Sequence, residues 1–275
     1  MERPQILIFG GTAAYHIKPS DFAQVVRTRT LETPYGPSPI FHALVTADGT
    51  ALWFASRHGE SSLDHSARFV NHRANLWAAQ MLGVRLVLSW NGVGAINPDL
   101  RVGDVVVPEG MMDWTRSRIN SFGEAALYPE EAAALRAAAR TIEHINNGRN
   151  PTQVAHPFDP TARQQLQAVA ADHHPRMDEN PPIEHLTYVC TEGPRLETAA
   201  EVDLAAELGA DMVGMTLCPE VWLAAELGLK YASLGQVTNF STGRWDIDPR
   251  REFGPPVAER AMRILLTAAD RMVGE

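Results

Sequence analysis

The sequence predicts an α/β protein in which a mixed, largely parallel sheet is flanked by helices. Short continuous apolar runs alternate with segments of helical spacing, and such runs are typical of parallel strands covered on both faces by helices. The chain has 275 residues, of which 45% are hydrophobic and 21% are charged. This length and composition fit one globular domain, which we expect to span residues 1–275.

The expected strands are short and apolar, and the expected helices lie between several of them. The strands are expected at 6–9, 51–55, 86–90, 105–107, 186–190, 212–213 and 231–237. The helices are expected at 70–82, 197–208, 219–227 and 256–272.

The region around 128–182 differs from its surroundings. It holds an Ala-rich, helix-favouring stretch at 129–145 and a polar linker at 146–151. The stretch 156–182 is expected to form a helix and then a loop. Because polar linkers stay hydrated at the protein surface, we expect a surface insertion on the sheet here.

Charge and composition exclude several classes of function. The chain has 24 Lys and Arg against 33 Asp and Glu, a net charge of -9, and no basic run. Nucleic acid and anionic membranes are therefore not expected partners. The apolar run near the N-terminus is too short for a signal peptide, and no run is long enough to span a membrane. We expect a soluble, cytoplasmic protein.

Cysteine and histidine spacing predicts neither a disulfide framework nor a metal site. Only Cys190 and Cys218 are present, which fits a reducing compartment. The ten histidines show no spacing typical of metal ligands, so we predict no bound metal.

Two short motifs follow expected strands and could bind an anion. FGGTAAYHI, residues 9–17, has no dinucleotide fingerprint, but its backbone amides and the Thr12 hydroxyl could face a phosphate. A plain tight turn is an equal alternative. SRHGES, residues 56–61, places Arg57 and His58 after a strand, where an Arg fork suits phosphate or carboxylate. Taken alone, a solvated pair is the commoner case.

The next two motifs place small and acidic residues at strand ends. In SWNGVGAINPDL the strand is expected to end at Asn91-Gly92, where either a ligand-binding edge or a structural turn fits. In TEGPRLETAAE, Glu197 falls near the start of a helix, with Glu201 four residues later. A glutamate at that position is commonly a capping residue, and otherwise could accept a ligand N–H.

The stretch 208–239 is expected to contain the ends of two further strands. Val213-Gly214-Met215-Thr216 precedes a helix, and the following strand ends in Thr238-Asn239. Polar side chains at the ends of neighbouring strands of a parallel sheet can meet at one edge.

The order of these motifs resembles the trimeric purine nucleoside phosphorylase and methylthioadenosine phosphorylase family. The matching blocks, from about residue 6 to 268, are GGT, RHG, NHRANLWA, NGVGAI, HPFDP, EGPRLETAAE, GADMVGMT with the following PE, and VTN. The resemblance implies phosphorolysis of a purine nucleoside to free purine and an α-pentose 1-phosphate. It also implies a homotrimer and no cofactor, with inorganic phosphate as co-substrate.

The resemblance also assigns roles to individual residues. Catalytic roles fall to Asn239, which would face the purine N7, and to His58 and Arg57. The implied phosphate-binding residues are Thr12, Arg57, His58, Asn91, Gly92 and Thr216. The implied base- and ribose-binding residues are Leu196, Glu197, Val213, Gly214, Met215 and Asn239.

The pair Glu197 and Asn239 favours a 6-oxopurine. A carboxylate can accept from N1–H of hypoxanthine or guanine but would face the bare N1 lone pair of adenine. RHG, NHRAN and EGPR are closer to the methylthio branch of the family, so 5′-methylthioinosine satisfies both signals. The segment 244–257 is expected to help line the 5′ pocket. The alternative is a 5′-methylthioadenosine phosphorylase.

Three residues depart from the family pattern. Ala13 stands where the phosphate turn usually has Gly, Trp90 where a smaller residue is common, and Leu196 where Phe often flanks the base. These departures keep open a second alternative, a catalytically weak purine-binding or sensing protein with the same fold.

Overall fold

A ten-stranded mixed sheet forms the centre of the protein in the computed structural model, which describes residues 5–60, 62–123, 129–130, 132–146, 154, 156–173 and 183–273. Its strands are β1 (Ile6–Gly10), β2 (Gln24–Arg29), β5 (Phe41–Val45), β6 (Ala51–Ser56), β7 (Leu86–Ala95), β8 (Val105–Val106), β9 (Gly110–Asp113), β10 (Thr187–Cys190), β11 (Met212–Gly214) and β12 (Lys230–Phe240). A separate hairpin pairs β3 (Glu32–Thr33) with β4 (Gly36–Pro37).

The strand order is β2-β5-β6-β1-β7-β11-β10-β9, and β12 pairs with both β7 and β8. Parallel pairs join β1 to β6 and β7, β7 to β12, and β10 to β9 and β11. The pairs β2–β5, β5–β6, β7–β11 and β8–β12 are antiparallel. The prediction of a mixed, largely parallel sheet flanked by helices is confirmed.

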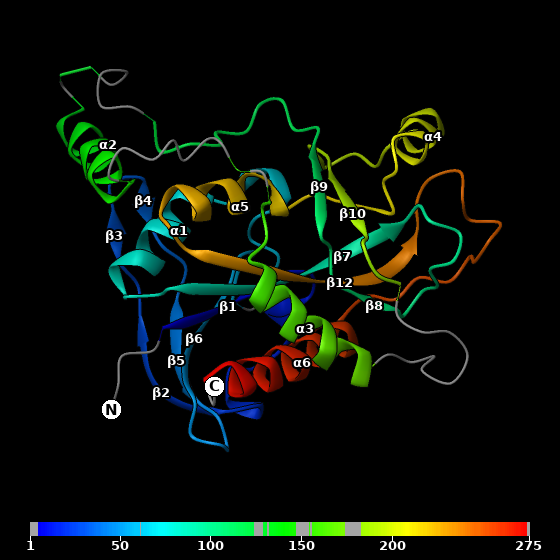
Figure 1. Cartoon of the computed structure of the whole chain (residues 1–275). Coiled ribbons are helices and arrows are strands. Elements are labelled where there is room, and N and C mark those ends of the chain that lie inside the picture. The colour runs from blue at the N-terminus through cyan, green and yellow to red at the C-terminus, as the bar shows by residue number, and fades with distance from the viewer. Residues whose placement is uncertain are drawn as a thin grey trace.

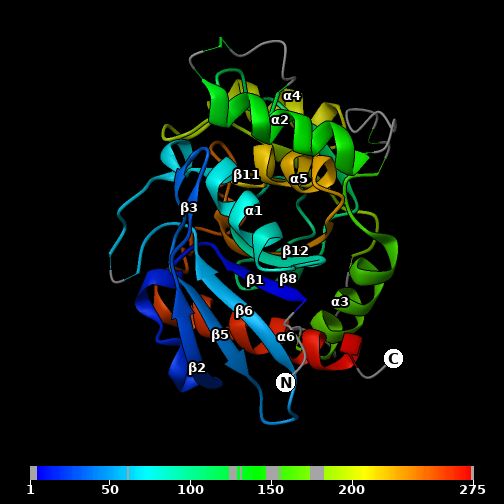
Figure 2. The same cartoon turned by 90° about the vertical axis from the view of Figure 1, so that its left-hand side faces the viewer.

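Helices cover both faces of this sheet, as Figures 1 and 2 show. In Figure 1, α3 and α6 lie below β7 and β12, and α1 and α5 lie above them. The helices are α1 (His72–Met81), α2 (Ala133–Asn146), α3 (Pro160–Asp172), α4 (Ala199–Glu207), α5 (Leu217–Glu226) and α6 (Pro255–Val273).

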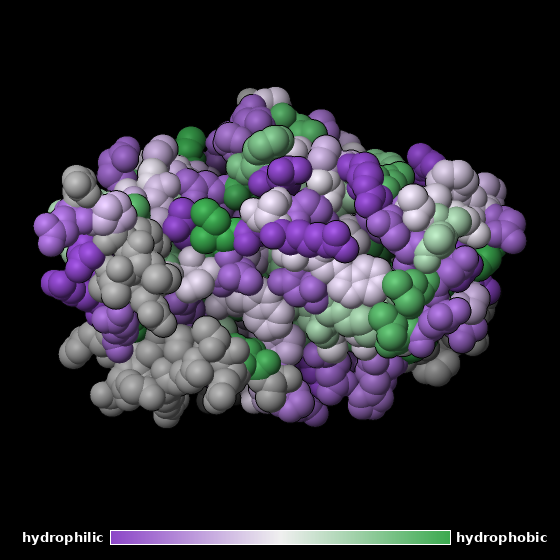
Figure 3. Space-filling model, turned by 90° about the horizontal axis from the view of Figure 1, so that it is seen from above, coloured by the Kyte–Doolittle hydropathy of each residue, from purple (hydrophilic) through white to green (hydrophobic). Residues whose placement is uncertain are grey.

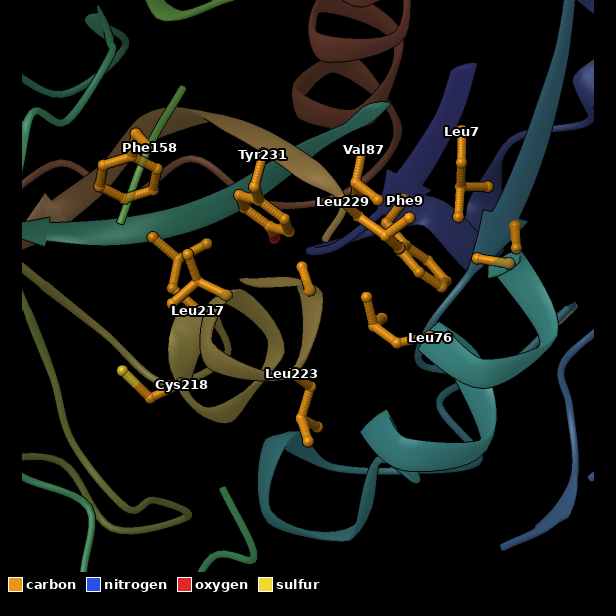
Figure 4. Packing of buried hydrophobic residues seen from close by; sticks show 14 of the residues in the cluster. Leu7, Phe9, Leu76, Val87, Phe158, Leu217, Cys218, Leu223, Leu229 and Tyr231 are labelled. Carbon is orange, nitrogen blue, oxygen red and sulfur yellow. The ribbon is translucent and has the colours of Figure 1, made fainter. Parts of the chain in front are cut away.

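Two hydrophobic cores separate these layers. Strand β1 supplies both, because alternate side chains of a strand point to opposite faces. Leu7 and Phe9 join the core with α1 and α5, whereas Ile6 and Ile8 join the core with α3 and α6. Figure 4 shows the first core, in which Leu217 of α5 lies on the side of the helix that faces the sheet. The outer surface seen from above in Figure 3 is mixed in polarity, with apolar residues in small groups.

The end of β7 differs from the prediction. The sequence predicts a strand end at Asn91-Gly92 because glycines are common in turns, but that prediction is wrong: β7 continues to Ala95. Its glycines serve close packing, since a Cβ at Gly92 would lie 2.7 Å from the Thr12 Oγ1 atom. Strands β2, β5 and β9 were not predicted. Strand β2 is mostly exposed and polar, so it lacks the apolar pattern used to find strands.

The region 128–182 contributes two helices. The Ala-rich stretch forms α2, and the second stretch forms α3, which begins at the N-cap Asp159 and packs against α6 and β12. Residues 147–151 of the predicted linker and the stretch 174–182 lie outside the described residues, so the surface insertion stays a prediction there. Helix α3 itself belongs to a core, because Leu166 and Val169 are fully buried.

Both Cys190 and Cys218 are free thiols buried in the core. Within the described ranges, no helix has the length and apolar character needed to cross a membrane.

Shortening a buried side chain of α3 should destabilise the whole domain. Leu166→Ala removes a fully buried side chain from the core that α3 shares with α6, and it should lower the free energy of unfolding by about 2–5 kcal/mol. Gln164→Ala, on the exposed face of the same helix, is the matched control and should change it by less than about 0.5 kcal/mol. Urea denaturation measures both. Equal effects would mean that α3 is not part of the cooperative core.

Candidate active site

A cavity of about 250 Å³ lies at the ends of several central strands. Ten of the twelve residues predicted for the site line it: Thr12, His58, Gly92, Leu196, Glu197, Val213, Gly214, Met215, Thr216 and Asn239. The other two, Arg57 and Asn91, are buried residues that do not line the cavity. The long β7 brings these segments together, because it pairs with β1, β11 and β12.

Thr12 follows β1, and its side chain lines the cavity. The Gly92 amide donates to the Thr12 Oγ1 atom at 2.9 Å. Since this bond uses an oxygen lone pair, the hydroxyl proton of Thr12 can be donated to another acceptor in the cavity. The turn therefore offers a hydrogen-bond donor at a fixed position.

Thr216 also lines the cavity and is hydrogen-bonded to Asn91 of β7. The Thr216 hydroxyl donates to the Asn91 Oδ1 atom, and the Asn91 Nδ2 group donates to the Ser233 Oγ atom at 2.8 Å. Asn91 thus lies behind the cavity wall and holds Thr216 against β7.

Arg57 is buried next to Glu220, and each of its three guanidinium nitrogens donates one hydrogen bond. Nε and Nη2 donate to the two Glu220 carboxylate oxygens at 2.9 and 2.6 Å, and Nη1 donates to the Trp90 carbonyl at 3.0 Å. Burial would raise the pKa of Glu220, but the charge of Arg57 and the contact with His72 hold it down at about 2. The ion pair therefore stays charged under ordinary conditions.

His58 follows Arg57 and faces the cavity as a neutral ring. Burial, followed by the positive charge of Arg57, lowers the pKa of His58 to about 4. Its Nδ1 atom lies 2.9 Å from the His65 carbonyl oxygen. A carbonyl can only accept, so Nδ1 carries the proton and Nε2 of the neutral ring keeps a lone pair.

Glu197 also lines the cavity, and it does not cap helix α4. Thr198 is the N-cap residue and forms a capping box with Glu201, whose carboxylate also pairs with Arg195. The alternative of Glu197 as a capping residue is therefore excluded. Glu197 is 8% exposed, and its Oε1 atom accepts a hydrogen bond from the Thr191 hydroxyl. This bond fixes the carboxylate at the cavity wall.

Asn239 lies near the end of β12, after a register shift between Val237 and Asn239. Its Nδ2 group donates to the Phe240 carbonyl at 2.9 Å, which fixes the orientation of the amide because a carbonyl cannot donate. One Nδ2 proton remains for an acceptor in the cavity.

Gly214 is required by the packing behind the cavity. A Cβ on Gly214 would lie 2.1 Å from the Tyr188 hydroxyl oxygen, so any larger residue would displace the tyrosine. The glycine thus allows β11 to lie directly on the Tyr188 side chain.

Several residues of the cavity were not predicted individually. Trp245 and Phe253 line it from the segment 244–257, which the sequence did indicate as a whole. Ser241 follows β12, and its buried Oγ atom has no hydrogen-bond partner within the described part of the chain. The remaining lining residues are Ala67, Val93, Gly94, Thr238 and Thr242.

Arg118 lies outside the cavity and is hydrogen-bonded to the backbone of segments that line it. No sequence motif marks this residue. Its Nη1 atom donates to the carbonyls of Met215 and Cys218, and its Nη2 atom donates to the Glu192 carbonyl at 2.6 Å. These carbonyls follow two different strands, β11 and β10. One guanidinium group therefore fixes the spacing between the segments that lead to Thr216 and Glu197.

The described residues include no group of three or more His, Cys, Asp or Glu side chains that could hold a metal ion. The polar groups at the cavity are hydroxyls, one imidazole, one carboxylate and one carboxamide. This set can bind an anion and a hydrogen-bonding ring through direct contacts.

Acid should destabilise the protein partly through His58. A ring with a folded pKa of about 4 and an ordinary value of 6.5 stabilises fully above pH 6.5, and this contribution is lost as the pH falls toward 4. Between pH 7.5 and 5, His58→Gln should therefore lose about 2 kcal/mol less free energy of unfolding than the wild type. Urea denaturation in phosphate-free buffer measures the difference.

The matched control for this pH effect is His16→Gln, which replaces an exposed histidine. It should keep the pH dependence of the wild type. If His58→Gln and the wild type lost stability equally, the buried neutral state of His58 would be contradicted.

The chain is similar to known proteins over most of its length. Residues 5–270 match the family model described as the phosphorylase superfamily. A "6-oxopurine nucleoside phosphorylase" of Pyrococcus furiosus is 36% identical over 247 residues, covering 87% of this chain and 81% of the relative. A "Probable S-methyl-5'-thioinosine phosphorylase" of Xylella fastidiosa is 34% identical over 249 residues, covering 90% and 88%.

A solved structure shows the same fold. The methylthioadenosine phosphorylase from Schistosoma mansoni in complex with adenine superposes with a TM-score of 0.75 at 28% identity, covering 98% of this chain and 92% of that one. Because the family model spans nearly the whole chain and these relatives align over most of their length, the chain belongs to the phosphorylase superfamily, among the purine nucleoside and methylthioadenosine phosphorylases.

Proposed function

We propose that this pentosyltransferase cleaves a 6-oxopurine nucleoside with inorganic phosphate, giving the free purine and an α-pentose 1-phosphate. One observation carries the proposal: Thr12, His58 and Thr216 share a single cavity with Glu197 and Asn239. A phosphate site and a purine site can thus face the two sides of one ribose. The names of the relatives in Pyrococcus furiosus and Xylella fastidiosa support the same reaction class.

The phosphate end would bind inorganic phosphate as the co-substrate, and no other cofactor is needed. The Thr12 hydroxyl would donate to one phosphate oxygen. The lone pair on the His58 Nε2 atom would accept a hydrogen bond from a protonated phosphate oxygen. Thr216 lines the same cavity and would contact the same anion once its hydroxyl proton turns away from the Asn91 Oδ1 atom.

Arg57 and Asn91 would act on phosphate from behind the wall. A Cβ on Gly11 would lie 2.8 Å from the Arg57 Nη1 atom, so the guanidinium lies directly beneath the Thr12 turn. Glu220 neutralises much of its charge. We therefore expect the hydrogen-bond donors of the turn to contribute more to phosphate affinity than the net charge of this pair.

The reaction would depend mainly on positioning. As the bond between C1′ and N9 breaks, the sugar becomes cationic and the base becomes anionic, and a phosphate oxygen forms the new bond to C1′. The free Nδ2 proton of Asn239 would stabilise negative charge at N7. The purine anion would then take up, through water, the proton that the phosphate releases, and leave as the neutral base. A single preorganised donor of this kind typically changes the rate by ~10²–10³-fold.

The base end favours a 6-oxopurine. The Glu197 carboxylate can accept N1–H of hypoxanthine or guanine, and Asn239 can donate to N7. Adenine would place its N1 lone pair against the carboxylate, a mismatch that costs ~1–3 kcal/mol in a buried site. Val213, Gly214 and Met215 would lie along the ribose and base.

The mouth of the cavity favours an apolar 5′ substituent, so 5′-methylthioinosine is the substrate that we favour. Leu196, Trp245 and Phe253 line the cavity and are 55%, 44% and 58% exposed. Large apolar side chains of this kind can cover a methylthio group, whereas a 5′-hydroxyl would gain nothing from them.

We also propose a homotrimer in the cytoplasm. The family resemblance supports the trimer, and the two free thiols and the absence of a spanning helix in the described ranges fit a reducing cytoplasm. Analytical ultracentrifugation of the purified chain would test the trimer directly.

The preference for 6-oxopurines should depend on Glu197. In phosphate buffer the wild type should release hypoxanthine from 5′-methylthioinosine with a higher kcat/KM than adenine from 5′-methylthioadenosine. Glu197→Gln supplies an amide that can donate to N1 of adenine, and it should lower this ratio by about tenfold or more. Measuring base release by absorbance gives both constants.

The control is Glu201→Gln, the same change at the capping glutamate of α4. It should leave the ratio of the two substrates unchanged. Preferential release of adenine by the wild type would favour a methylthioadenosine phosphorylase instead. Binding of the nucleoside without phosphate-dependent turnover would indicate a purine-binding protein.

A further inference from the structure

We propose that Trp90 is a positioning residue that holds the Thr12 turn in place, and that it compensates for the alanine at position 13. This inference rests on the proposed function, because it assigns Trp90 an effect on phosphate binding through Thr12. Trp90 itself lies outside the cavity and would touch no substrate.

The Trp90 indole is packed directly under the turn. It is fully buried, and its Nε1–H donates to the Thr12 carbonyl at 3.0 Å. Its ring stacks on Phe54, with centroids 6.1 Å apart and planes 20° apart. A Cβ at Gly10, the last residue of β1, would come within 2.9 Å of the indole, so the ring packs closely against the strand end that leads into the turn.

Ala13 adopts a backbone conformation that disfavours alanine. Its φ is 63° and its ψ is 7°, in the left-handed region that only glycine enters without strain. The Thr12 carbonyl belongs to the peptide group that leads into Ala13. A hydrogen bond from Trp90 to this carbonyl therefore opposes the rotation by which the alanine would relieve its strain.

The same short part of β7 holds Thr12 at a second point. The Gly92 amide donates to the Thr12 Oγ1 atom, two residues after Trp90. With both bonds present, the carbonyl and the hydroxyl of Thr12 are fixed to one strand. Without the indole N–H, Thr12 keeps only the hydrogen bond to its hydroxyl. The peptide group between Thr12 and Ala13 can then rotate and shift the Thr12 hydroxyl away from phosphate.

Removing the indole N–H should therefore weaken phosphate binding selectively. Trp90→Phe keeps an aromatic ring but loses the bond, and it should raise the KM for phosphate by about fivefold. The KM for the nucleoside and kcat should stay within about twofold of the wild type. Steady-state kinetics at varied phosphate and saturating nucleoside measures this split.

Trp53→Phe is the matched control. Trp53 is also a buried tryptophan of the sheet, but its Nε1 atom has no hydrogen-bond partner within the described ranges. The same substitution there removes an N–H without breaking a bond, and the KM for phosphate should be unchanged. A similar rise in both variants would show a general packing effect and overturn the proposal.

The link to Ala13 is tested by combining substitutions. Glycine adopts the left-handed conformation without strain, so in the Ala13→Gly background Trp90→Phe should raise the KM for phosphate by less than about twofold. If the factor were the same in the wild-type and Ala13→Gly backgrounds, the compensation between the two residues would be refuted. This double variant also restores the turn if Trp90→Phe alone folds poorly.

Failure of the proposed function would look different. A wild type without phosphate-dependent base release would contradict the phosphorylase reaction and leave the packing claim to be judged by stability. In that case, urea denaturation of the wild type, Trp90→Phe, Ala13→Gly and the double variant is the test. Trp90→Phe should be less destabilising in the Ala13→Gly background than in the wild type. If the two substitutions had additive effects on the free energy of unfolding, the inference would be refuted independently of the proposed function.

Discussion

The pairing of β7 with three other strands is the constraint on which the rest of the structure depends. Its first half lies between β1 and β12 in parallel register, and its end at Gly94-Ala95 pairs with β11 in antiparallel register. The segments after β1, β11 and β12 must therefore meet around Trp90 to Gly94. The position of the cavity follows from this pairing, since no single segment could supply both of its ends.

A buried polar network beneath the cavity connects its walls. Glu220 accepts from Arg57 and from the Tyr231 hydroxyl, and its Oε2 atom lies 3.2 Å from the His72 Nδ1 atom. From Tyr231 the contacts continue through Ser89, Ser233 and Asn91 to Thr216. Burying charges is costly unless they are paired and hydrogen-bonded. The network meets that condition and ties the floor of the cavity to the core.

The two ends of the cavity differ in chemistry for structural reasons. Hydroxyls and an uncharged imidazole line one end, because burial and the positive charge of Arg57 lower the pKa of His58. A fixed carboxylate and a fixed carboxamide line the other, because Thr191 and the Phe240 carbonyl hold them. Each functional group is thus oriented by a partner that does not itself need to contact a substrate. Arg118 has the same kind of role for the backbone.

The sequence by itself determined the alternation of strands and helices, and it marked most of the residues that line the cavity. It did so because buried strands require continuous apolar runs, and because polar or small residues directly after such runs must lie at the edge of the sheet. The family motifs added the order in which these edges occur. Helix α3 and the C-terminal segment were also visible as elements or stretches, although not their individual contacts.

Only the tertiary structure decided how each of these residues is used. Arg57 faces Glu220, 163 residues later, and no local pattern reveals that partner. The glycines at 92 and 94 lie within a strand, because they meet side chains from Thr12 and Ser241. Trp90 and Ala13 stand out in the sequence only as separate departures. The hydrogen bond from Trp90 goes to the carbonyl of Thr12, the residue before Ala13. Such a contact depends on strand register, which a linear sequence does not contain.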